Sequence, residues 1–170
     1  TITSANGTTF TVGSLGSFAF ATTGFPVPSI SVSGTLPSGV TYNPATRTVS
    51  GTPMAGSGGF YSLTLTANNG AGIATQTFTL TVNAPPTIQN PGNRQGTLNQ
   101  PTSLQIVASD PDANDTLTFS ATGLPTGLAI GPSNGLISGV PTKNGTFSVT
   151  VRVVDSLGAS ASVVFSWSIS

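Results

Sequence analysis

The acidic residues of this chain are few, and most of them are clustered. Asp110, Asp112 and Asp115 lie within six positions, and Asp155 is the fourth and last. Carboxylates this close repel one another unless a cation lies among them. Calcium takes about 6 to 8 oxygen ligands at roughly 2.3 to 2.6 Å, and it needs neither His nor Cys. The four aspartates therefore predict a calcium site.

The cluster has two other interpretations. Magnesium fits less well, because it keeps several of its waters and needs few carboxylates. Asp110-Pro111-Asp112 could also be a turn without an ion, since Asp side chains bond nearby backbone N–H groups. The number of acids favours the metal. Arg152 is the cation nearest to Asp155 in sequence, and its strand parity points it sideways from the loop tip.

The same side chains argue against catalysis. The sequence has no His to act as a general base, no Cys nucleophile and no Glu. Its carboxylates form one cluster rather than an acid and a base held apart. We therefore predict that the protein is not an enzyme.

The charge composition limits the partners. Only 5% of the residues are charged, the net charge is zero, and the four cations are spread along the chain. Nucleic-acid binding needs a basic stripe, and a membrane span needs about 20 consecutive apolar residues. The sequence has neither, so we expect no nucleic-acid partner and no membrane insertion. No leader peptide opens the chain, which we expect to be a segment of a longer protein.

The elements that would position the aspartates are β-strands. Thr, Ser, Val, 21 Gly and 13 Pro dominate, whereas Glu, Lys, Gln and Met are scarce. Phe147, Val149 and Val151 alternate with polar residues, as in a strand with one face in the core. Trp167 has the same inward parity, which favours core packing over an exposed sugar-binding position. We predict an all-β fold.

The chain is two copies of one unit. Leu36-Pro37-Ser38-Gly39 recurs as Leu124-Pro125-Thr126-Gly127, and Ser50-Gly51-Thr52-Pro53 recurs as Ser138-Gly139-Val140-Pro141, both 88 residues later (124 − 36 and 138 − 50). A unit of this length with about seven short strands is typical of an immunoglobulin-like β-sandwich.

The boundary between the copies is predicted at two successive prolines. Pro85 and Pro86 stiffen the backbone and cannot donate ladder hydrogen bonds. We therefore predict two tandem immunoglobulin- or cadherin-like sandwiches at 1–84 and 85–170.

On these motifs the chain resembles the bacterial "putative Ig" repeats, which are related to dystroglycan-type cadherin-like domains. Residues 34–53 carry the Ig-repeat pattern, and the second copy is more similar to the cadherin-like version, with its acidic turn within 108–119. The first copy departs from the calcium-type pattern. Gly24-Phe25-Pro26 stands at the turn and Asn69 stands where Asp155 would be, so we predict no acidic site there.

Both acidic segments are expected at one end of the second sandwich. If strands cover 102–108 and 116–121, residues 109–115 join them, and Asp155 opens the loop between the last two strands. In an immunoglobulin-like sandwich these loops emerge at the same end, where the chain also enters the domain. The resemblance implies that such turns bind calcium with linker groups and stiffen the junction between domains. Asn83 is the candidate linker ligand.

Two functions remain open. The first is a structural or adhesive calcium-binding segment of a large secreted or cell-surface bacterial protein, which contacts other surface proteins and neighbouring repeats. The second is a polysaccharide-binding accessory module of a secreted hydrolase or adhesin. Sugar binding needs exposed aromatic faces, and Phe10, Phe25 and Tyr42 lie outside the core pattern. Phe25 is the candidate sugar contact, whereas Tyr42 aligns with Ile130, which favours packing.

Homophilic contact is a further open alternative. The surface has little of the Lys that often protects edge strands from pairing with other chains. Edge-to-edge association of two copies is therefore compatible with the sequence.

Overall fold

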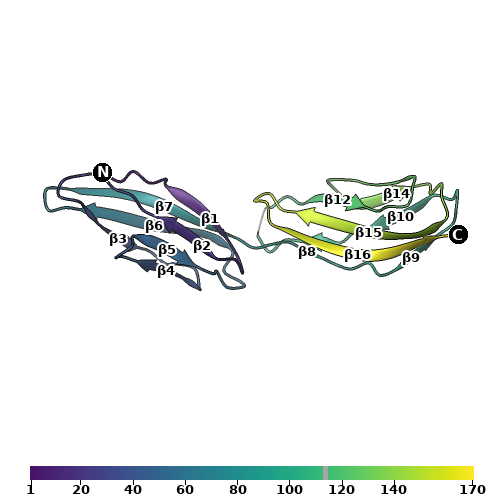
Figure 1. Cartoon of the computed structure of the whole chain (residues 1–170), viewed down its shortest axis with the longest axis horizontal. Coiled ribbons are helices and arrows are strands. Elements are labelled where there is room, and N and C mark those ends of the chain that lie inside the picture. The colour runs from purple at the N-terminus through teal and green to yellow at the C-terminus, as the bar shows by residue number, and fades with distance from the viewer. Residues whose placement is uncertain (113–114) are drawn as a thin grey trace. The chain divides into compact units, whose positions relative to one another are not determined.

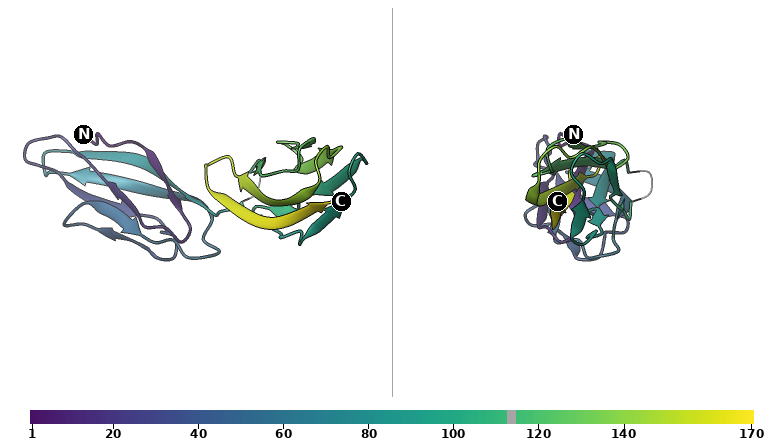
Figure 2. Two further views of the ribbon diagram at one scale, coloured as in Figure 1. Left: turned by 45° about the vertical axis from the view of Figure 1, so that its right-hand side comes forward. Right: turned by 90° about the vertical axis from the view of Figure 1, so that its right-hand side faces the viewer.

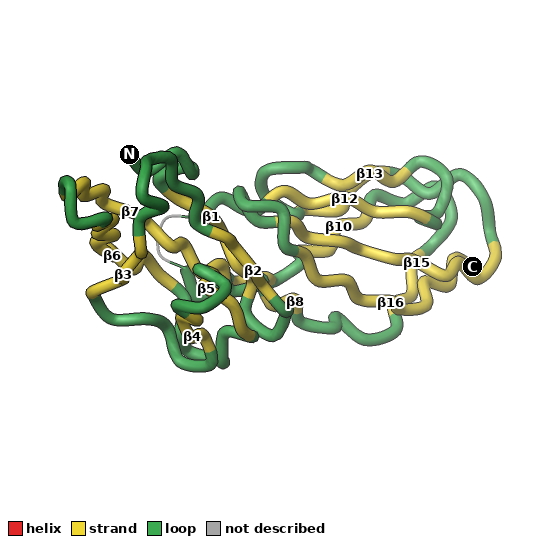
Figure 3. The backbone as a smooth tube through the Cα atoms, turned by 60° about the vertical axis from the view of Figure 1, so that its left-hand side comes forward, coloured by secondary structure: helices red, strands yellow, loops and turns green. Residues whose placement is uncertain are grey.

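The computed structural model describes residues 1–112 and 115–170, and all their regular structure is β-strand (Figure 1, Figure 3). The all-β prediction is confirmed. The described residues include no helix that is long and apolar enough to cross a membrane. The chain divides into two compact units, Thr1–Ala84 and Pro85–Ser170, which we call unit 1 and unit 2.

Unit 1 is a sandwich of two sheets. A four-stranded sheet has the order β1-β7-β6-β3, and a three-stranded sheet has the order β2-β5-β4. Strand β1 runs parallel to β7, and the other pairs are antiparallel. The strands are β1 (Gly7–Thr11), β2 (Gly16–Ala19), β3 (Ser29–Ser33), β4 (Val40–Asn43), β5 (Thr48–Gly51), β6 (Gly59–Asn68) and β7 (Ile73–Asn83).

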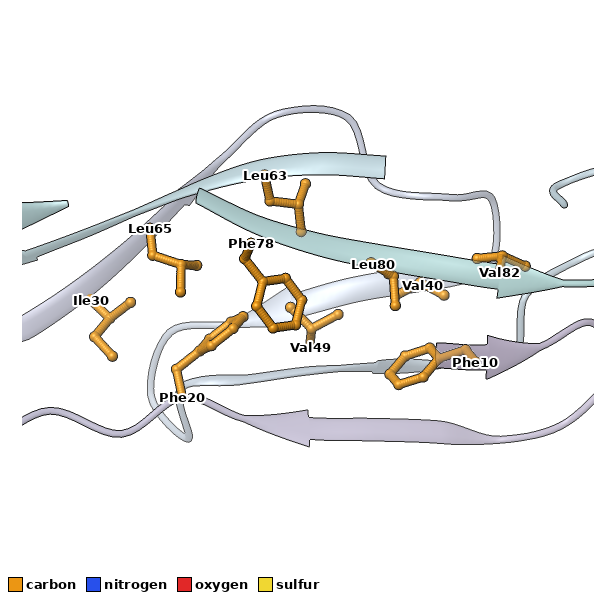
Figure 4. Packing of buried hydrophobic residues seen from close by; sticks show 10 residues of the cluster. All are labelled: Phe10, Phe20, Ile30, Val40, Val49, Leu63, Leu65, Phe78, Leu80 and Val82. Carbon is orange, nitrogen blue, oxygen red and sulfur yellow. The ribbon is translucent and has the colours of Figure 1, made fainter. Parts of the chain in front are cut away.

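Aromatic and branched side chains fill the space between these sheets (Figure 4). Leu63 and Phe78 lie opposite each other on β6 and β7, and both are fully buried. The rings of Phe20 and Phe78 pack edge to face with centroids 5.0 Å apart, a favoured geometry for aromatic pairs. Phe10 also lies in this core and is only 4% exposed, so its placement outside the core pattern is wrong. The reason is that β1 joins the sheet edge beside β7 and turns Phe10 inward.

Unit 2 repeats this sandwich. Its four-stranded sheet has the order β12-β15-β16-β9, its three-stranded sheet has the order β10-β14-β13, and a short pair joins β11 to β8. Trp167 is 1% exposed, which confirms that it packs in the core. The strands are β8 (Thr87–Ile88), β9 (Arg94–Gly96), β10 (Thr102–Gln105), β11 (Ala108–Ser109), β12 (Thr118–Thr122), β13 (Leu128–Ile130), β14 (Leu136–Gly139), β15 (Gly145–Val154) and β16 (Ser160–Ile169).

The strand expected at 102–108 is interrupted. Strand β10 pairs with β14 in one sheet, whereas β11 pairs with β8. Between them, the Ile106 N–H donates to the Gly135 carbonyl at 3.1 Å. The chain therefore changes partners just before the acidic segment, which leads from the end of β11 towards β12.

The repeated glycine motifs have a packing reason. Gly127 and Gly139 have φ values of +96° and +143°, which L side chains rarely adopt. A Cβ on Gly127 would lie 2.0 Å from the Val140 oxygen, and one on Gly139 would lie 2.1 Å from the Gly127 oxygen. The Leu-Pro-x-Gly and Ser-Gly-x-Pro turns therefore pack against each other through backbone that only glycine allows.

The pairing of β12 with β15 determines where the acidic loops meet. The two strands are antiparallel, and Thr118 at the start of β12 lies opposite Val154 at the end of β15. The segment before β12 and the β15–β16 turn therefore emerge at the same end of unit 2, which we call the acidic end (Figure 2).

Candidate metal centre

Asp155 lies in the β15–β16 turn, and hydrogen bonds from backbone N–H groups to the Asp155 carboxylate close this turn. It is only 6% exposed. Its Oδ1 accepts hydrogen bonds from the N–H groups of Leu157 at 3.0 Å and Ala159 at 2.8 Å. The Asp155 N–H donates to the Ala159 carbonyl at 3.0 Å. The carboxylate is therefore fixed by backbone that follows it in sequence.

Asp110 and Asp115 come from the segment between β11 and β12. Each carboxylate accepts a hydrogen bond through its Oδ1 atom. Asp110 Oδ1 accepts a hydrogen bond from the Asp112 N–H at 2.8 Å. Asp115 Oδ1 accepts one from the Ser156 hydroxyl, which belongs to the β15–β16 turn. Each carboxylate is thus oriented by a hydrogen bond to its Oδ1, and the Ser156 bond joins the two loops.

The three carboxylates converge. Asp110, Asp115 and Asp155 each offer an oxygen within 4.8 Å of the others. Two calcium–oxygen bonds span about 5 Å, so one ion can reach all three. The Oδ2 atoms of Asp110 and Asp115 are buried and accept no hydrogen bond from the described residues. Buried acceptors without donors are costly, and a cation would satisfy them.

The electrostatics of Asp110 reflect this crowding. Burial raises the pKa of Asp110 above its ordinary value, and the negative charges of Asp112, Asp115 and Asp155 raise it further. The hydrogen bond from the Asp112 N–H acts in the opposite direction. Arg152 is the cation nearest to Asp155 in sequence, and its guanidinium donates a hydrogen bond to the Ser160 hydroxyl at 2.9 Å. The ionised form of Asp110 is therefore disfavoured by its surroundings in the metal-free protein.

Two further residues were predicted as ligands, Asp112 in unit 2 and Asn83 in unit 1. Asp112 contributes its N–H to Asp110 but is not one of the three converging carboxylates. Asn83 is the last residue of β7 in unit 1, is 1% exposed, and accepts a hydrogen bond from the Val12 N–H through its carbonyl. The expected 109–115 loop includes residues 113 and 114, which lie outside the described residues. Sequence reasoning missed Ser156, although a hydroxyl directly after Asp155 could have suggested it.

The corresponding end of unit 1 is closed by an amide. Asn69 takes the position of Asp155, and its Oδ1 accepts hydrogen bonds from the Ala71 and Gly72 N–H groups at 3.2 and 3.1 Å. Its Nδ2 donates to the Pro26 carbonyl at 3.0 Å, which belongs to the loop before β3. Residues 1–86 contain no Asp or Glu. This end therefore joins its two loops without an acidic group.

Phe25 lies at the same end of unit 1 and is 93% exposed. It lines a groove of about 400 Å³, together with residues that include Thr23, Asn69 and Ile73. Tyr42 instead donates its hydroxyl proton to the Ile30 carbonyl at 2.9 Å and packs against the core. Of the three aromatic residues considered for sugar binding, Phe25 alone is fully exposed.

The sequence is similar to stretches of staphylococcal adhesins. It is 32% identical over 138 residues to the "Serine-rich adhesin for platelets" of Staphylococcus aureus strain MRSA252, covering 79% of this chain and 10% of the adhesin. The USA300 adhesin is 31% identical over the same length, with 6% of the adhesin covered. The chain thus spans a tenth or less of these relatives.

Solved structures support the fold. Extracellular domains 3–5 of Drosophila OTK match 96% of this chain and 59% of that chain with a TM-score of 0.67 and 15% identity. The titin I-band fragment I67–I69 matches 95% of this chain and 62% of that chain with a TM-score of 0.56 and 18% identity. The family model described as "Putative Ig domain" matches residues 1–83 and again 85–170. The chain therefore belongs to the Putative Ig domain family, of which it contains two copies.

Proposed function

We propose that the chain is a non-catalytic adhesion-type segment of a secreted or cell-surface protein, and that unit 2 binds calcium. The proposed ligands are the carboxylates of Asp110, Asp115 and Asp155. The ion would bridge the segment before β12 and the β15–β16 turn. Its role would be structural, because it would fix the two loops at the acidic end of unit 2.

One observation carries the calcium proposal. The Oδ2 atoms of Asp110 and Asp115 are buried without a donor from the described residues, in a group of three carboxylates that converge within 4.8 Å. Their Oδ1 atoms are already held by the Asp112 N–H and the Ser156 hydroxyl. Carboxylate oxygens suit a hard cation, and calcium can complete its shell with water or backbone oxygens.

The adhesion part of the proposal rests on similarity. The related Staphylococcus aureus proteins are named as adhesins for platelets, and this chain aligns with a small part of them. We propose that the chain contacts other surface molecules or neighbouring repeats, and that its parent is exposed outside the cell. The predicted effect of calcium on the junction between the units, with Asn83 as a ligand, stays a prediction that rotational diffusion measurements with and without calcium would check.

Calorimetric titration of calcium into the whole chain tests the metal site. We expect one site, and we expect Asp110→Asn to weaken binding strongly because it removes one of the three converging carboxylates. Asp112→Asn is the matched control, since it removes an equal charge two residues away and keeps the N–H that orients Asp110. Binding should therefore fall much less in Asp112→Asn.

Two outcomes would contradict the proposal. The absence of any binding heat at millimolar calcium would exclude the proposed calcium site. Equal losses in Asp110→Asn and Asp112→Asn would mean that calcium only screens the general negative charge of the segment.

Polysaccharide binding is the second candidate, and the exposure of Phe25 favours it. An aromatic ring beside a groove with an amide and hydroxyls is the kind of surface that stacks on a sugar ring. A glycan array with the whole chain tests this function. Phe25→Ser should abolish binding, whereas Phe60→Ser should not, because Phe60 is 80% exposed but is not among the residues that line the groove. Equal effects of the two changes would indicate nonspecific apolar adsorption.

A further inference from the structure

Unit 2 carries a small polar pocket that is separate from the three-carboxylate group and from the Phe25 groove. Its volume is about 160 Å³, and it shares no residue with either of those two sites. The pocket is lined by Gln89, Asn90, Pro91, Arg94, Gln105 and Val107. We propose that this pocket binds a uronic-acid residue of an acidic polysaccharide, and that the sugar carboxylate pairs with Arg94.

Unit 1 has the backbone of this pocket without its side chains. The Gln89 N–H donates to the Val107 carbonyl at 2.9 Å. The Thr3 N–H donates to the Ala21 carbonyl in the same way, 86 residues earlier (89 − 3 and 107 − 21). At this spacing the side chain in unit 1 is smaller at each of the six positions, which are Thr3, Ser4, Ala5, Thr8, Ala19 and Ala21. The fold therefore does not require the larger side chains that line the pocket in unit 2.

Arg94 supplies the charge of the pocket. It lies on β9, the edge strand of its sheet, and pairs in register with Trp167 of β16. Paired residues share a face of the sheet, and Trp167 is buried in the core, so Arg94 leaves the edge strand on the side that faces the other sheet. Its guanidinium forms no hydrogen bond or ion pair with the residues that the structure describes. A guanidinium can bind a carboxylate through two parallel hydrogen bonds.

Two amide side chains of the pocket are held in place. Gln105 Nε2 donates to the Ile106 carbonyl at 2.9 Å and to the Asn134 carbonyl at 2.7 Å, which uses both of its hydrogens and leaves Oε1 as an acceptor. Asn90 Oδ1 accepts a hydrogen bond from the Gly92 N–H at 2.8 Å. Among the described residues, one carbonyl lies near Asn90 Nδ2, at 3.5 Å, so a second Nδ2 hydrogen is left as a donor. The pocket thus offers a fixed acceptor and a fixed donor.

The size and chemistry of the pocket indicate the ligand class. Sites for drug-sized molecules span roughly 300 to 1,000 Å³, so this smaller pocket suits one residue of a longer polymer. The amides match the hydroxyls of a sugar, and Pro91 and Val107 add apolar surface for its C–H groups. Arg94 is the charged residue of the lining, which favours an acidic sugar over a neutral one. An inward-pointing charge at a sheet edge also hinders pairing with another chain, but that role requires neither the amides nor a pocket.

NMR titration of the whole isotope-labelled chain tests the pocket. The probes are glucuronate and glucose, which differ by the carboxylate at one carbon, and chelator is present so that calcium cannot bridge sugar and protein. Glucuronate should shift the backbone amide signals of Gln89, Arg94 and Val107 in a saturable way. Glucose should bind at least about tenfold more weakly, because it offers the guanidinium no charged acceptor. Acetylglycine, which has a carboxylate and no hydroxyls, should also bind more weakly than glucuronate.

Three variants locate the effect. Arg94→Gln should lower the affinity for glucuronate at least about tenfold. Arg152→Gln is the matched control, because it removes the same charge from unit 2 at a side chain that bonds Ser160, and it should keep the affinity. Phe25→Ser should also leave glucuronate binding unchanged. The result is therefore independent of the Phe25 groove and, in chelator, of the calcium site.

Four outcomes would overturn the assignment. Glucuronate might produce no saturable shift, glucose might bind as tightly as glucuronate, or the two arginine variants might lose equal affinity. Binding of acetylglycine as tight as that of glucuronate would assign the pocket to a peptide carboxylate instead of a sugar.

Discussion

The two units close the same pair of loops with different chemistry. In unit 1 the side chain of Asn69 accepts two backbone N–H groups and donates its own Nδ2 to the Pro26 carbonyl. In unit 2 Asp155 accepts two backbone N–H groups in the same way and lies among other carboxylates. Asp155 therefore accepts the loop N–H groups as Asn69 does, but it has no donor that corresponds to Nδ2 of Asn69.

This difference gives a physical reason for the cation that we propose in unit 2. An amide has both donors and acceptors, so it can bridge two loops directly, whereas an ionised carboxylate only accepts. Asp155 cannot donate to Asp110 or Asp115, and a bound ion would do for unit 2 what Nδ2 of Asn69 does for unit 1. The comparison predicts that calcium stabilises unit 2 alone.

The largest expected effect is this selective stabilisation. At a calcium concentration 100 times the dissociation constant, linkage adds about 2.7 kcal/mol to the free energy of unfolding of unit 2. The single tryptophan, Trp167, is buried in unit 2, so its fluorescence follows this unit during denaturation. Replacing calcium with chelator should lower the midpoint of the Trp167 signal. The transition of Tyr42 and Tyr61 in unit 1 should not move.

Asp155→Asn converts the acidic end of unit 2 towards the chemistry of unit 1. The Asn keeps an oxygen for the Leu157 and Ala159 N–H groups, so we expect little loss of stability in chelator. The calcium-dependent shift of the Trp167 signal should disappear. If calcium still stabilised this variant by a similar amount, the ion would bind elsewhere.

The reverse exchange in unit 1 should lower the free energy of unfolding by less than calcium adds to that of unit 2. Asn69→Asp removes the hydrogen bond to the Pro26 carbonyl and places a negative charge against that oxygen, which we expect to destabilise unit 1 by about 1 kcal/mol. Calcium should not restore the loss, because no other acid lies in unit 1. Asn68→Asp is the matched control. It adds the same charge at the preceding residue, and it keeps the side-chain oxygen that accepts a hydrogen bond from the Gly70 N–H.

Much of this comparison could be predicted from the sequence. The strand alternation and the repeated glycine turns led to the all-β tandem fold, because both depend on local backbone geometry. The substitution of Asp155 by Asn69 was visible from the spacing of the two copies. The convergence of Asp155 with Asp110 and Asp115 followed from the loop order of an immunoglobulin-like sandwich.

The remainder depends on contacts that spacing does not determine. Asp112 and Asp115 are equivalent acids in sequence, yet Asp115 belongs to the three-carboxylate group and Asp112 does not. Phe10 was not expected in the core, since a short edge strand such as β1 shows too few alternating residues to reveal its buried face. The bond from Ser156 to Asp115 joins residues 41 positions apart.

Ser156→Ala tests that bond with a smaller expected effect. Removal of the hydroxyl frees Asp115 to adopt other rotamers, and loss of a residue that orients a metal ligand typically weakens metal binding at least about tenfold. Ser156 is exposed, so we expect a smaller, severalfold loss of calcium affinity in the calorimetric titration. Ser160→Ala is the control, since its hydroxyl bonds Arg152 instead. Equal losses in the two variants would argue against a positioning role.

The smallest effect is the pH dependence of unit 2 without metal. The pKa of Asp110 is raised in the folded state, so the folded chain holds this proton to a higher pH than the unfolded chain does. The free energy of unfolding in chelator should therefore fall as pH rises from the ordinary pKa of Asp through the raised value, and then level off. In calcium the sign reverses, because the ion binds the ionised carboxylate and stabilises unit 2 more as the proton leaves. Denaturation followed through Trp167 should show both slopes, and Asp110→Asn should abolish the falling one. A metal-free slope of the same size in Asp110→Asn would mean that another group carries it.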